Sequence, residues 1–277
     1  MPSSIFAPGL LEGKVIVVTG GGSGLGRATA QELSACGATV VVAGRRGEPL
    51  EETQSLCEGP CDAVVCDIRE EDQVAALVDG VLARHGRIDT LVNNAGGQYM
   101  SPAEEINAKG FETVVRLNLI GTWLVSHAVA TKAMIPAGGG KIISVTLSPH
   151  HGLPGMAHSS AARAAVENLM RVLSIEWARF NVKTTAIASG HFRTDALKKY
   201  PEPVQQGAAR TVPLQRLGEA EEQAWLVAYL ASRAGDYFSG TTLTLDGARD
   251  NWFGPWPPPH LIDEEGKPLR EERRPSS

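Results

Sequence analysis

Three glycines follow a short run of β-branched residues near the N-terminus. The run KVIVVT (14–19) leads into GGGSGLGRATA, which places Gly20, Gly24 and Gly26 where a predicted strand turns into a predicted helix. A Cβ there would keep a pyrophosphate from the backbone, and a helix beginning near Leu25 would direct its free amides at that anion. The spacing predicts a dinucleotide-binding turn; the alternative is a purely structural turn.

A second chemically suggestive stretch is HSSAARAAV, residues 158–166. Ser159 and Arg163 are four residues apart, so on a helix they lie on one face. A serine hydroxyl can donate a hydrogen bond, and a guanidinium supplies a permanent positive charge, but neither exchanges a proton easily near neutral pH. The pair therefore indicates a site that binds and polarises rather than one that titrates.

The elements that position these residues can be predicted from periodicity. Short β-branched runs alternate with longer segments of helical spacing, which is typical of a parallel sheet covered by helices on both faces. The sequence therefore predicts an α/β fold, a single doubly wound Rossmann-type domain over residues 1–248. The predicted strands are 14–19, 38–43, 63–67, 90–94, 141–146, 182–188 and 242–246.

The composition changes after Gly247, where the chain becomes rich in proline and charge. Proline cannot support a continuing helix or a central strand. Residues 249–277 are therefore predicted to form an irregular arm that lies on the body or on a neighbouring subunit. Disorder of the last dozen residues is an equal alternative.

Bulk properties limit the partners. The chain has 277 residues, 43% of them hydrophobic, and a net charge of −5, which favours a small soluble substrate over nucleic acid or a membrane surface. The N-terminus lacks a basic segment followed by an apolar core, and the ending RPSS does not resemble a peroxisomal signal, so we expect a cytoplasmic protein. The cysteine spacing is poor for zinc, and no metal site is expected.

The motif Thr-Gly-x3-Gly-x-Gly resembles that of the short-chain dehydrogenase/reductase family, and further motifs follow in the family's order over about residues 10–250. The resemblance implies that Asp67 and Ile68 contact adenine. It implies that the turn of Asn94, Ala95 and Gly96 lies beside the ribose, and that Asn118 is the family's structural asparagine on a long helix.

The segment Ser189–Thr194 resembles the family's Pro-Gly-x-x-x-Thr, with serine in place of proline. The resemblance implies that Gly190, Phe192 and Thr194 hold the nicotinamide carboxamide. It also implies a homotetramer, or a dimer, built through the helices containing residues 103–135 and 158–178.

Cofactor preference is predicted at the end of the second strand, where NAD-dependent proteins place an acidic residue. Here Gly44 is followed by Arg45 and Arg46, whose planar guanidinium groups suit a 2′-phosphate. We therefore expect NADPH, with Ser23 as a neutral neighbour of the phosphates. The alternative is that both arginines are solvated charges at a helix start.

In this family the helix after the fifth strand carries Tyr-x-x-x-Lys. The resemblance places Ser159 at the tyrosine position and Arg163 at the lysine position, where Arg163 would hold the nicotinamide ribose. The family's serine falls on Thr146, with Ser148 as a neighbouring candidate for substrate contact. Both hydroxyls could equally be loop caps.

Other groups near this motif could supply a proton or line the cleft. His150, His151 and His158 have an ordinary pKa near neutrality, although loop histidines more often serve the surface or packing. Tyr99 follows the ribose turn and is expected to line the substrate cleft, together with His158. Tyr200 lies in the segment where relatives bury substrate.

The absent tyrosine suggests hydride transfer to carbon rather than to a carbonyl. Reduction of an α,β-unsaturated thioester forms an enolate, which needs hydrogen-bond donors at oxygen and not a phenolic acid there. The motifs resemble the trans-2-enoyl-CoA reductase branch of the family and predict an NADPH-dependent reductase of an acyl-CoA, with Asn118, Thr146, Ser159 and Arg163 catalytic. The alternatives are an alcohol or aldehyde dehydrogenase for a hydrophobic substrate such as citronellol, and a protein that binds NADP(H) without chemistry.

Overall fold

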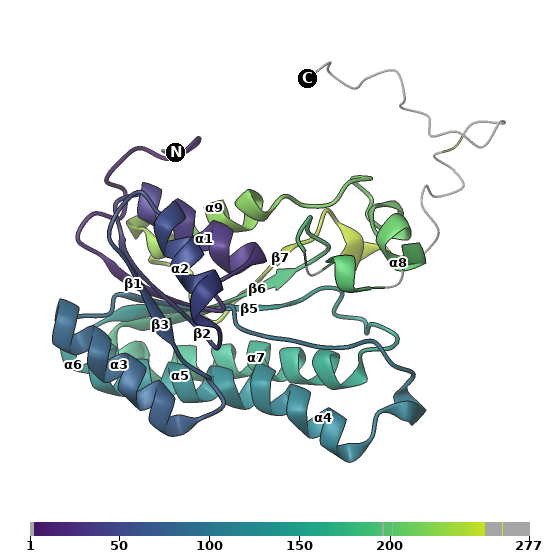
Figure 1. Ribbon diagram of the computed structural model, residues 1–277, viewed down its shortest axis with the longest axis horizontal. Coiled ribbons are helices and arrows are strands. Elements are labelled where there is room, and N and C mark those ends of the chain that lie inside the picture. The colour runs from purple at the N-terminus through teal and green to yellow at the C-terminus, as the bar shows by residue number, and fades with distance from the viewer. Residues whose placement is uncertain (1–2, 196, 201, 253–261, 263–277) are drawn as a thin grey trace.

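The structure, a computed structural model, describes residues 3–195, 197–200, 202–252 and 262. Its centre is a seven-stranded parallel sheet in the order β3-β2-β1-β4-β5-β6-β7 (Figure 1). The strand order reverses between β1 and β4, which is where a doubly wound sheet opens a crevice at its carboxyl edge. The predicted fold is confirmed.

The seven strands occupy the seven predicted positions, and one is displaced along the chain. The prediction for the third strand was 63–67, whereas β3 covers Cys61–Val65. Its ladder with β2 ends where Val65 pairs with Gly44, the last residue of β2. The amide of Cys66 makes the last hydrogen bond to β2, to the Gly44 carbonyl at 2.8 Å, and the amide of Asp67 donates to Gln73 of α3 instead. The strands are β1 Val15–Thr19, β2 Thr39–Gly44, β3 Cys61–Val65, β4 Thr90–Asn93, β5 Gly140–Leu147, β6 Val182–Ser189 and β7 Thr242–Leu245.

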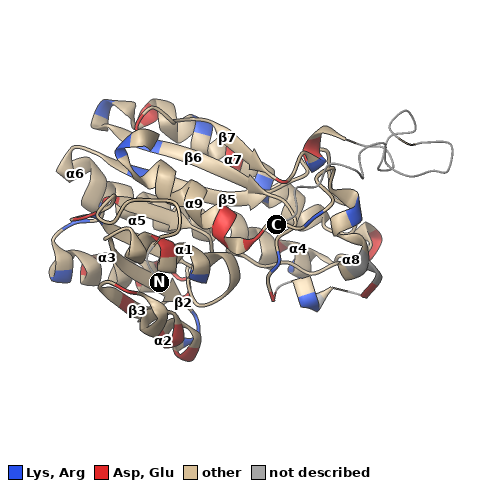
Figure 2. Cartoon of the chain, turned by 90° about the horizontal axis from the view of Figure 1, so that it is seen from above, with Lys and Arg blue, Asp and Glu red and all other residues tan. Residues whose placement is uncertain are grey.

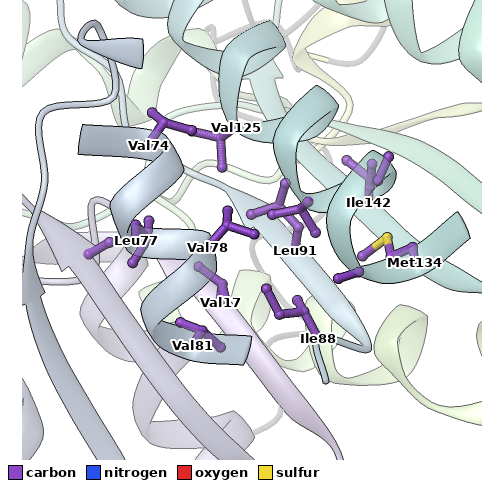
Figure 3. Close-up of a cluster of buried hydrophobic side chains, with 14 of the residues drawn as sticks. Val17, Val74, Leu77, Val78, Val81, Ile88, Leu91, Val125, Met134 and Ile142 are labelled. Atoms are coloured by element: carbon purple, nitrogen blue, oxygen red, sulfur yellow. The ribbon is translucent and has the colours of Figure 1, made fainter. Parts of the chain in front are cut away.

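Helices cover both faces of the sheet because successive strand residues point to opposite sides. Val17 packs toward α3, α5 and α7, whereas Ile16 and Val18 pack toward α1, α2 and α9. Figure 3 shows Val78 of α3 beside Leu91 from the sheet. The helices are α1 Gly24–Ala35, α2 Gly47–Leu56, α3 Glu71–His85, α4 Ala108–Val115, α5 Gly121–Val129, α6 Ile135–Ala137, α7 Ala157–Glu176, α8 Glu202–Gly207 and α9 Ala220–Ala231.

One continuous helix runs from Ala108 to Ala137 and contains two π-helical segments, η2 (Arg116–Ile120) and η3 (Ala130–Met134). Among the described residues it is the one helix long and apolar enough to cross a membrane, by length and composition alone. Its side chains Val125 and Val129 are fully buried in the core below the sheet. Its apolar character is therefore that of a core helix.

Charged side chains of both signs are distributed over the molecule. Figure 2 shows lysine and arginine interspersed with aspartate and glutamate over the helices.

Only part of the predicted C-terminal arm is described. The short helix η8 (Arg249–Asn251) follows β7, and residues 253–261 and 263–277 lie outside the described residues.

The turn from β1 to α1 is packed too closely for side chains. Gly20 and Gly24 have φ of +68° and +51°, which L-residues rarely adopt. An added Cβ at Gly26 would lie 2.3 Å from the carbonyl oxygen of Gly20, and one at Gly20 would lie 2.8 Å from Cα of Ala95. These neighbours are backbone atoms that cannot rotate away. The glycines therefore let the turn close against the β4 loop.

Replacing Gly26 should open this turn. In Gly26→Ala the Gly20 carbonyl must move, so the Kd for the predicted dinucleotide, measured with NADPH and NADH as probes, should rise by at least about tenfold, equivalent to ~1.4 kcal/mol. Fluorescence titration measures this, with circular dichroism to verify folding. The matched control is Gly80→Ala on α3, where an added Cβ meets nothing within 4 Å. An unchanged Kd in Gly26→Ala would contradict the assignment of this turn.

Candidate active site

Side chains from three elements hold the glycine turn in place. The amide Nδ2 of Asn94 donates to the carbonyls of Thr19 and Gly20, at 3.1 and 3.3 Å. On the other side, Arg27 donates to the carbonyl of Gly22 at 2.8 Å and pairs with Glu52 at 2.5 Å. The predicted ribose residue Asn94 thus has a clear structural task, because it fixes the carbonyls of Thr19 and Gly20 at the start of the turn.

The end of β2 presents positive charge. Arg45 and Arg46 are exposed, and neither forms a hydrogen bond or an ion pair with any residue in the described ranges. Ser23 is exposed at the N-terminal cap of α1, and its hydroxyl makes no capping hydrogen bond there. These groups are free to meet a phosphate. The predicted adenine neighbour Asp67 is held by Arg69, whose hydrogen bonds keep the pKa of that carboxyl below its usual value.

The predicted nicotinamide segment closes the other side of the glycine turn. The Thr194 side chain lies 3.6 Å from the position of a Cβ on Gly24, so the loop after β6 reaches the start of α1. Phe192 is buried and bridges to Gly218, and Gly190 packs against Asp246 after β7. Gly190, Phe192 and Thr194 are therefore brought to the same edge as the glycine turn.

Arg163 is a buried cation on α7 that lies against Gly96. An added Cβ on Gly96 would stand 1.9 Å from Nη2 of Arg163 and 3.0 Å from Oδ1 of Asn118. Nη1 of Arg163 donates to the carbonyl of Val145 at 2.8 Å. Burial lowers the pKa of the Arg163 guanidinium to about 10, so it stays charged at neutral pH. No carboxylate of the described residues pairs with it, which leaves N–H groups for a ligand.

Asn118 fixes the loop on which Gly96 lies. Its fully buried side chain accepts from the amide of Gly97 at 3.0 Å and donates to the carbonyl of Gly97 at 3.1 Å. Asn118 lies in the π-helical segment η2, and such single π turns in helices are frequent at functional sites. The predicted asparagine, the ribose turn and Arg163 therefore meet in one place.

Ser159 is connected to Tyr200 by two hydrogen bonds through the side chain of Gln98. Its buried hydroxyl donates to Oε1 of Gln98 at 2.8 Å, and Nε2 of Gln98 donates to the hydroxyl of Tyr200 at 3.0 Å. Sequence reasoning assigned no role to Gln98 and gave Tyr200 only a position near the substrate. Gln98 follows Gly96 by two residues. Its position in the sequence, just after the predicted ribose turn, was the feature that could have identified it as a candidate.

His158 is fully buried beside Ser159. Its ring packs edge-on against Tyr99, with centroids 4.5 Å apart, and Nε2 has no hydrogen-bond partner among the described residues. Burial lowers the pKa of His158, so the ring is neutral at pH 7. The two predicted substrate residues Tyr99 and His158 are thus in contact with each other.

Thr146 and Ser148 are engaged away from Ser159. The hydroxyl of Thr146 donates to Oε1 of Glu167 at 2.9 Å, and the hydroxyl of Ser148 donates to the carboxylate of Asp246. Two of the predicted cofactor-binding residues, Ile68 and Leu25, differ in exposure. Ile68 is buried in the core below the sheet, and Leu25 is half-buried in the first turn of α1. The roles of these four residues stay predictions.

Comparison with known proteins agrees with this geometry. A family model described as enoyl-(acyl carrier protein) reductase matches residues 20–248. A probable 2,4-dienoyl-CoA reductase of Bacillus subtilis is 36% identical over 89% of this chain and all of its own length. The peroxisomal 2,4-dienoyl-CoA reductase of Danio rerio is 33% identical over 88% of this chain and 83% of its length.

Solved structures are similar to this chain over the same range, and their names mention other substrates. A citronellol catabolism dehydrogenase of Pseudomonas aeruginosa is 43% identical, with a TM-score of 0.81, over 89% of this chain and 99% of that one. Levodione reductase is 30% identical with a TM-score of 0.83, over 88% of this chain and all of that one. With the fold, the glycine turn and these matches together, the chain belongs to the short-chain dehydrogenase/reductase family and is an oxidoreductase of that family.

Proposed function

We propose that this oxidoreductase uses NADPH to reduce the C2=C3 double bond of a 2-enoyl-CoA thioester. The observation that carries the proposal is the pair Ser159 and Arg163, buried on one face of α7 beside Gly96. The pair offers a hydroxyl and a guanidinium but no phenolic acid at that position. The names of the Bacillus and Danio relatives support an unsaturated acyl-CoA as the substrate class.

The residues present fit NADPH. The turn at Gly20, Gly24 and Gly26 leaves the backbone open to a pyrophosphate, and Arg45 and Arg46 are free to hold the 2′-phosphate. When bound, the cofactor supplies a hydride. Arg163 lies against the ribose turn and would position the nicotinamide ribose, while Thr194 and Gly190 would border the carboxamide.

The donors suit an enolate. Addition of hydride at C3 moves negative charge to the thioester oxygen, which is stabilised by donors fixed before the reaction. The Ser159 hydroxyl can exchange its Gln98 acceptor for that oxygen, and Arg163 has N–H groups beyond the one that donates to Val145. Asn118 holds the Gly97 backbone and thereby the loop beneath both.

Protonation at C2 still needs an acid, and Tyr200 is the proposed one. Its hydroxyl accepts from Gln98, so its own proton remains available to a substrate. Two hydrogen bonds through Gln98 connect that phenol to Ser159, which supports an acid close to the atoms that Ser159 would polarise. The proton donor, Tyr200, would then come from the segment after β6. The hydrogen-bond donor to the thioester oxygen, Ser159, would come from α7.

A second candidate is a dehydrogenase for a hydrophobic alcohol or aldehyde. The 43% identity to the citronellol catabolism dehydrogenase favours it. In that reaction the acid must exchange a proton with a carbonyl or alcohol oxygen. Tyr200, held by its hydrogen bond from Gln98, could supply that proton.

A substrate series separates these functions. NADPH oxidation should be much faster with trans-2-enoyl-CoA and 2,4-dienoyl-CoA thioesters than with enals of matched length, because enals lack the CoA group that the proposed substrate carries. Saturated aldehydes should not be reduced, because they have no C2=C3 bond to accept the hydride. Absorbance at 340 nm measures it, with product masses to locate the reduced bond. Turnover of aldehydes alone would establish the second candidate, and NADPH binding without turnover would indicate a non-catalytic protein.

Removing one hydroxyl tests the proton donor. In Tyr200→Phe, kcat for an enoyl-CoA should fall by about 10²-fold, the lower range for loss of a general acid. Ser159→Ala should lose only about tenfold, since Arg163 still donates to the oxygen. Tyr229→Phe is the matched control. Tyr229 lies on α9, on the opposite face of the sheet from α7, and its ring packs against Phe238. A larger loss in Ser159→Ala than in Tyr200→Phe would assign the acid role elsewhere.

Cofactor preference is tested by removing the two arginines at the end of β2. In Arg45→Ala/Arg46→Ala the Kd for NADPH should rise about tenfold or more, since a hydrogen bond to a charged group contributes roughly 1.5–3 kcal/mol. The Kd for NADH should be unchanged, because NADH lacks the 2′-phosphate. Arg179→Ala, an exposed arginine against Phe180, is the control. Equal effects on both cofactors would contradict NADP selection here.

A further inference from the structure

His150 lies between two carboxylates from different parts of the chain. Its Nδ1 is hydrogen-bonded to the carboxylate of Asp250, and its Nε2 lies 3.0 Å from Oε1 of Glu167. The backbone amide of His150 also donates to Asp250, at 2.6 Å. Asp250 follows β7, whereas Glu167 is on α7, so one imidazole joins three segments.

The contacts favour a positive imidazole. A neutral ring has one N–H, so it can donate to one carboxylate and would turn a lone pair toward the other. With both carboxyl groups ionised, both contacts are hydrogen bonds only if both ring nitrogens carry a proton, so the geometry favours an imidazolium at His150. Burial alone would lower the pKa of His150, but Asp250 and Glu167 outweigh it and raise that pKa above its ordinary value.

Glu167 depends on this cation. Its side chain is 5% exposed, and it accepts from Thr146 at 2.9 Å and from Thr242 at 3.4 Å. A second cation, Arg171, lies farther away, at 3.8 Å, and is half exposed. A buried carboxylate that loses its cation is left with a large desolvation cost.

Four further charged or titratable groups lie around the cluster of His150, Asp250 and Glu167. Asp246 accepts from Ser148 and from the backbone amide of Asp250. His151 lies 3.7 Å from Asp250, and Arg249 contacts His191 at 3.1 Å. Hydrogen bonds from the ring and the backbone of His150 hold the pKa of Asp250 below its usual value despite its burial. The contact between His150 and Asp250 therefore favours the charged form of both groups.

We propose that protonated His150 is a positioning residue that clamps the segment after β7, residues 246–252, onto the loop 148–151. That loop connects β5 to the helix carrying Ser159, so the clamp sets one wall beside the candidate site. The clamp concerns the protein alone and does not depend on which substrate is reduced.

The raised pKa fixes the direction of the pH response. The stabilisation by His150 is fully present below the unfolded pKa of about 6.5 and is lost as pH rises through the higher folded value. The segment 246–252 should therefore open as the solution becomes alkaline. For each unit by which the folded pKa exceeds the unfolded one, opening increases by about tenfold.

Hydrogen–deuterium exchange of the peptide containing 246–252, corrected for the intrinsic effect of pH, tests the clamp without substrate or cofactor. In the native chain exchange should accelerate from pH 6 to pH 9, in step with the titration of His150 measured by NMR. His150→Gln should exchange rapidly at every pH. His127→Gln, the matched control at an exposed position on α5, should behave like the native chain.

Two carboxylate variants make the test specific. In Glu167→Gln the amide can donate to Nε2 of a neutral His150 while Nδ1–H still donates to Asp250, so protection should persist at pH 9. Asp250→Asn, at a less buried position, should flatten the profile for the same reason and serves if Glu167→Gln folds poorly. Equal protection in His150→Gln and the native chain, or an unchanged pH profile in both carboxylate variants, would overturn the proposal. These outcomes are independent of the enoyl-CoA assays.

Discussion

The parallel hydrogen bonding of seven strands is the constraint on which the rest of the molecule depends. Because the strands run the same way, their carboxyl ends share one edge, and the loops that follow β1, β2, β4, β5 and β6 all arrive there. The glycine turn, Arg45 and Arg46, the Gly96 loop and the Thr194 segment come from widely separated parts of the chain. They lie at one edge of the sheet, where the candidate site is, because all the strands run in the same direction.

Helix α7 is the second determinant of the site. Ser159, Arg163 and Glu167 follow one another at four-residue intervals on its buried side. The first leads to Gln98 and Tyr200, the second lies against Gly96, and the third holds His150. One helix face thus carries a hydroxyl, a guanidinium and a carboxyl group. Each of these side chains contacts a residue from a loop outside the helix.

Much of the fold and of the nucleotide site could be predicted from the sequence. Strand positions followed from β-branched runs, and the turn at Gly20 to Gly26 followed from local spacing. The error at β3 arose because its end is set by pairing with Gly44 rather than by its own residues. The contacts between Gln98 and Tyr200 and between His150 and Asp250 could not be predicted, because they join residues 102 and 100 positions apart. No local pattern encodes such pairs.

The contact of Arg163 with Gly96 also constrains how this chain can evolve. Because Nη2 of Arg163 occupies the space that a Cβ at position 96 would need, a side chain can be acquired there only if Arg163 moves. A shorter side chain at position 163 would remove that conflict. The two positions are therefore expected to change together during evolution.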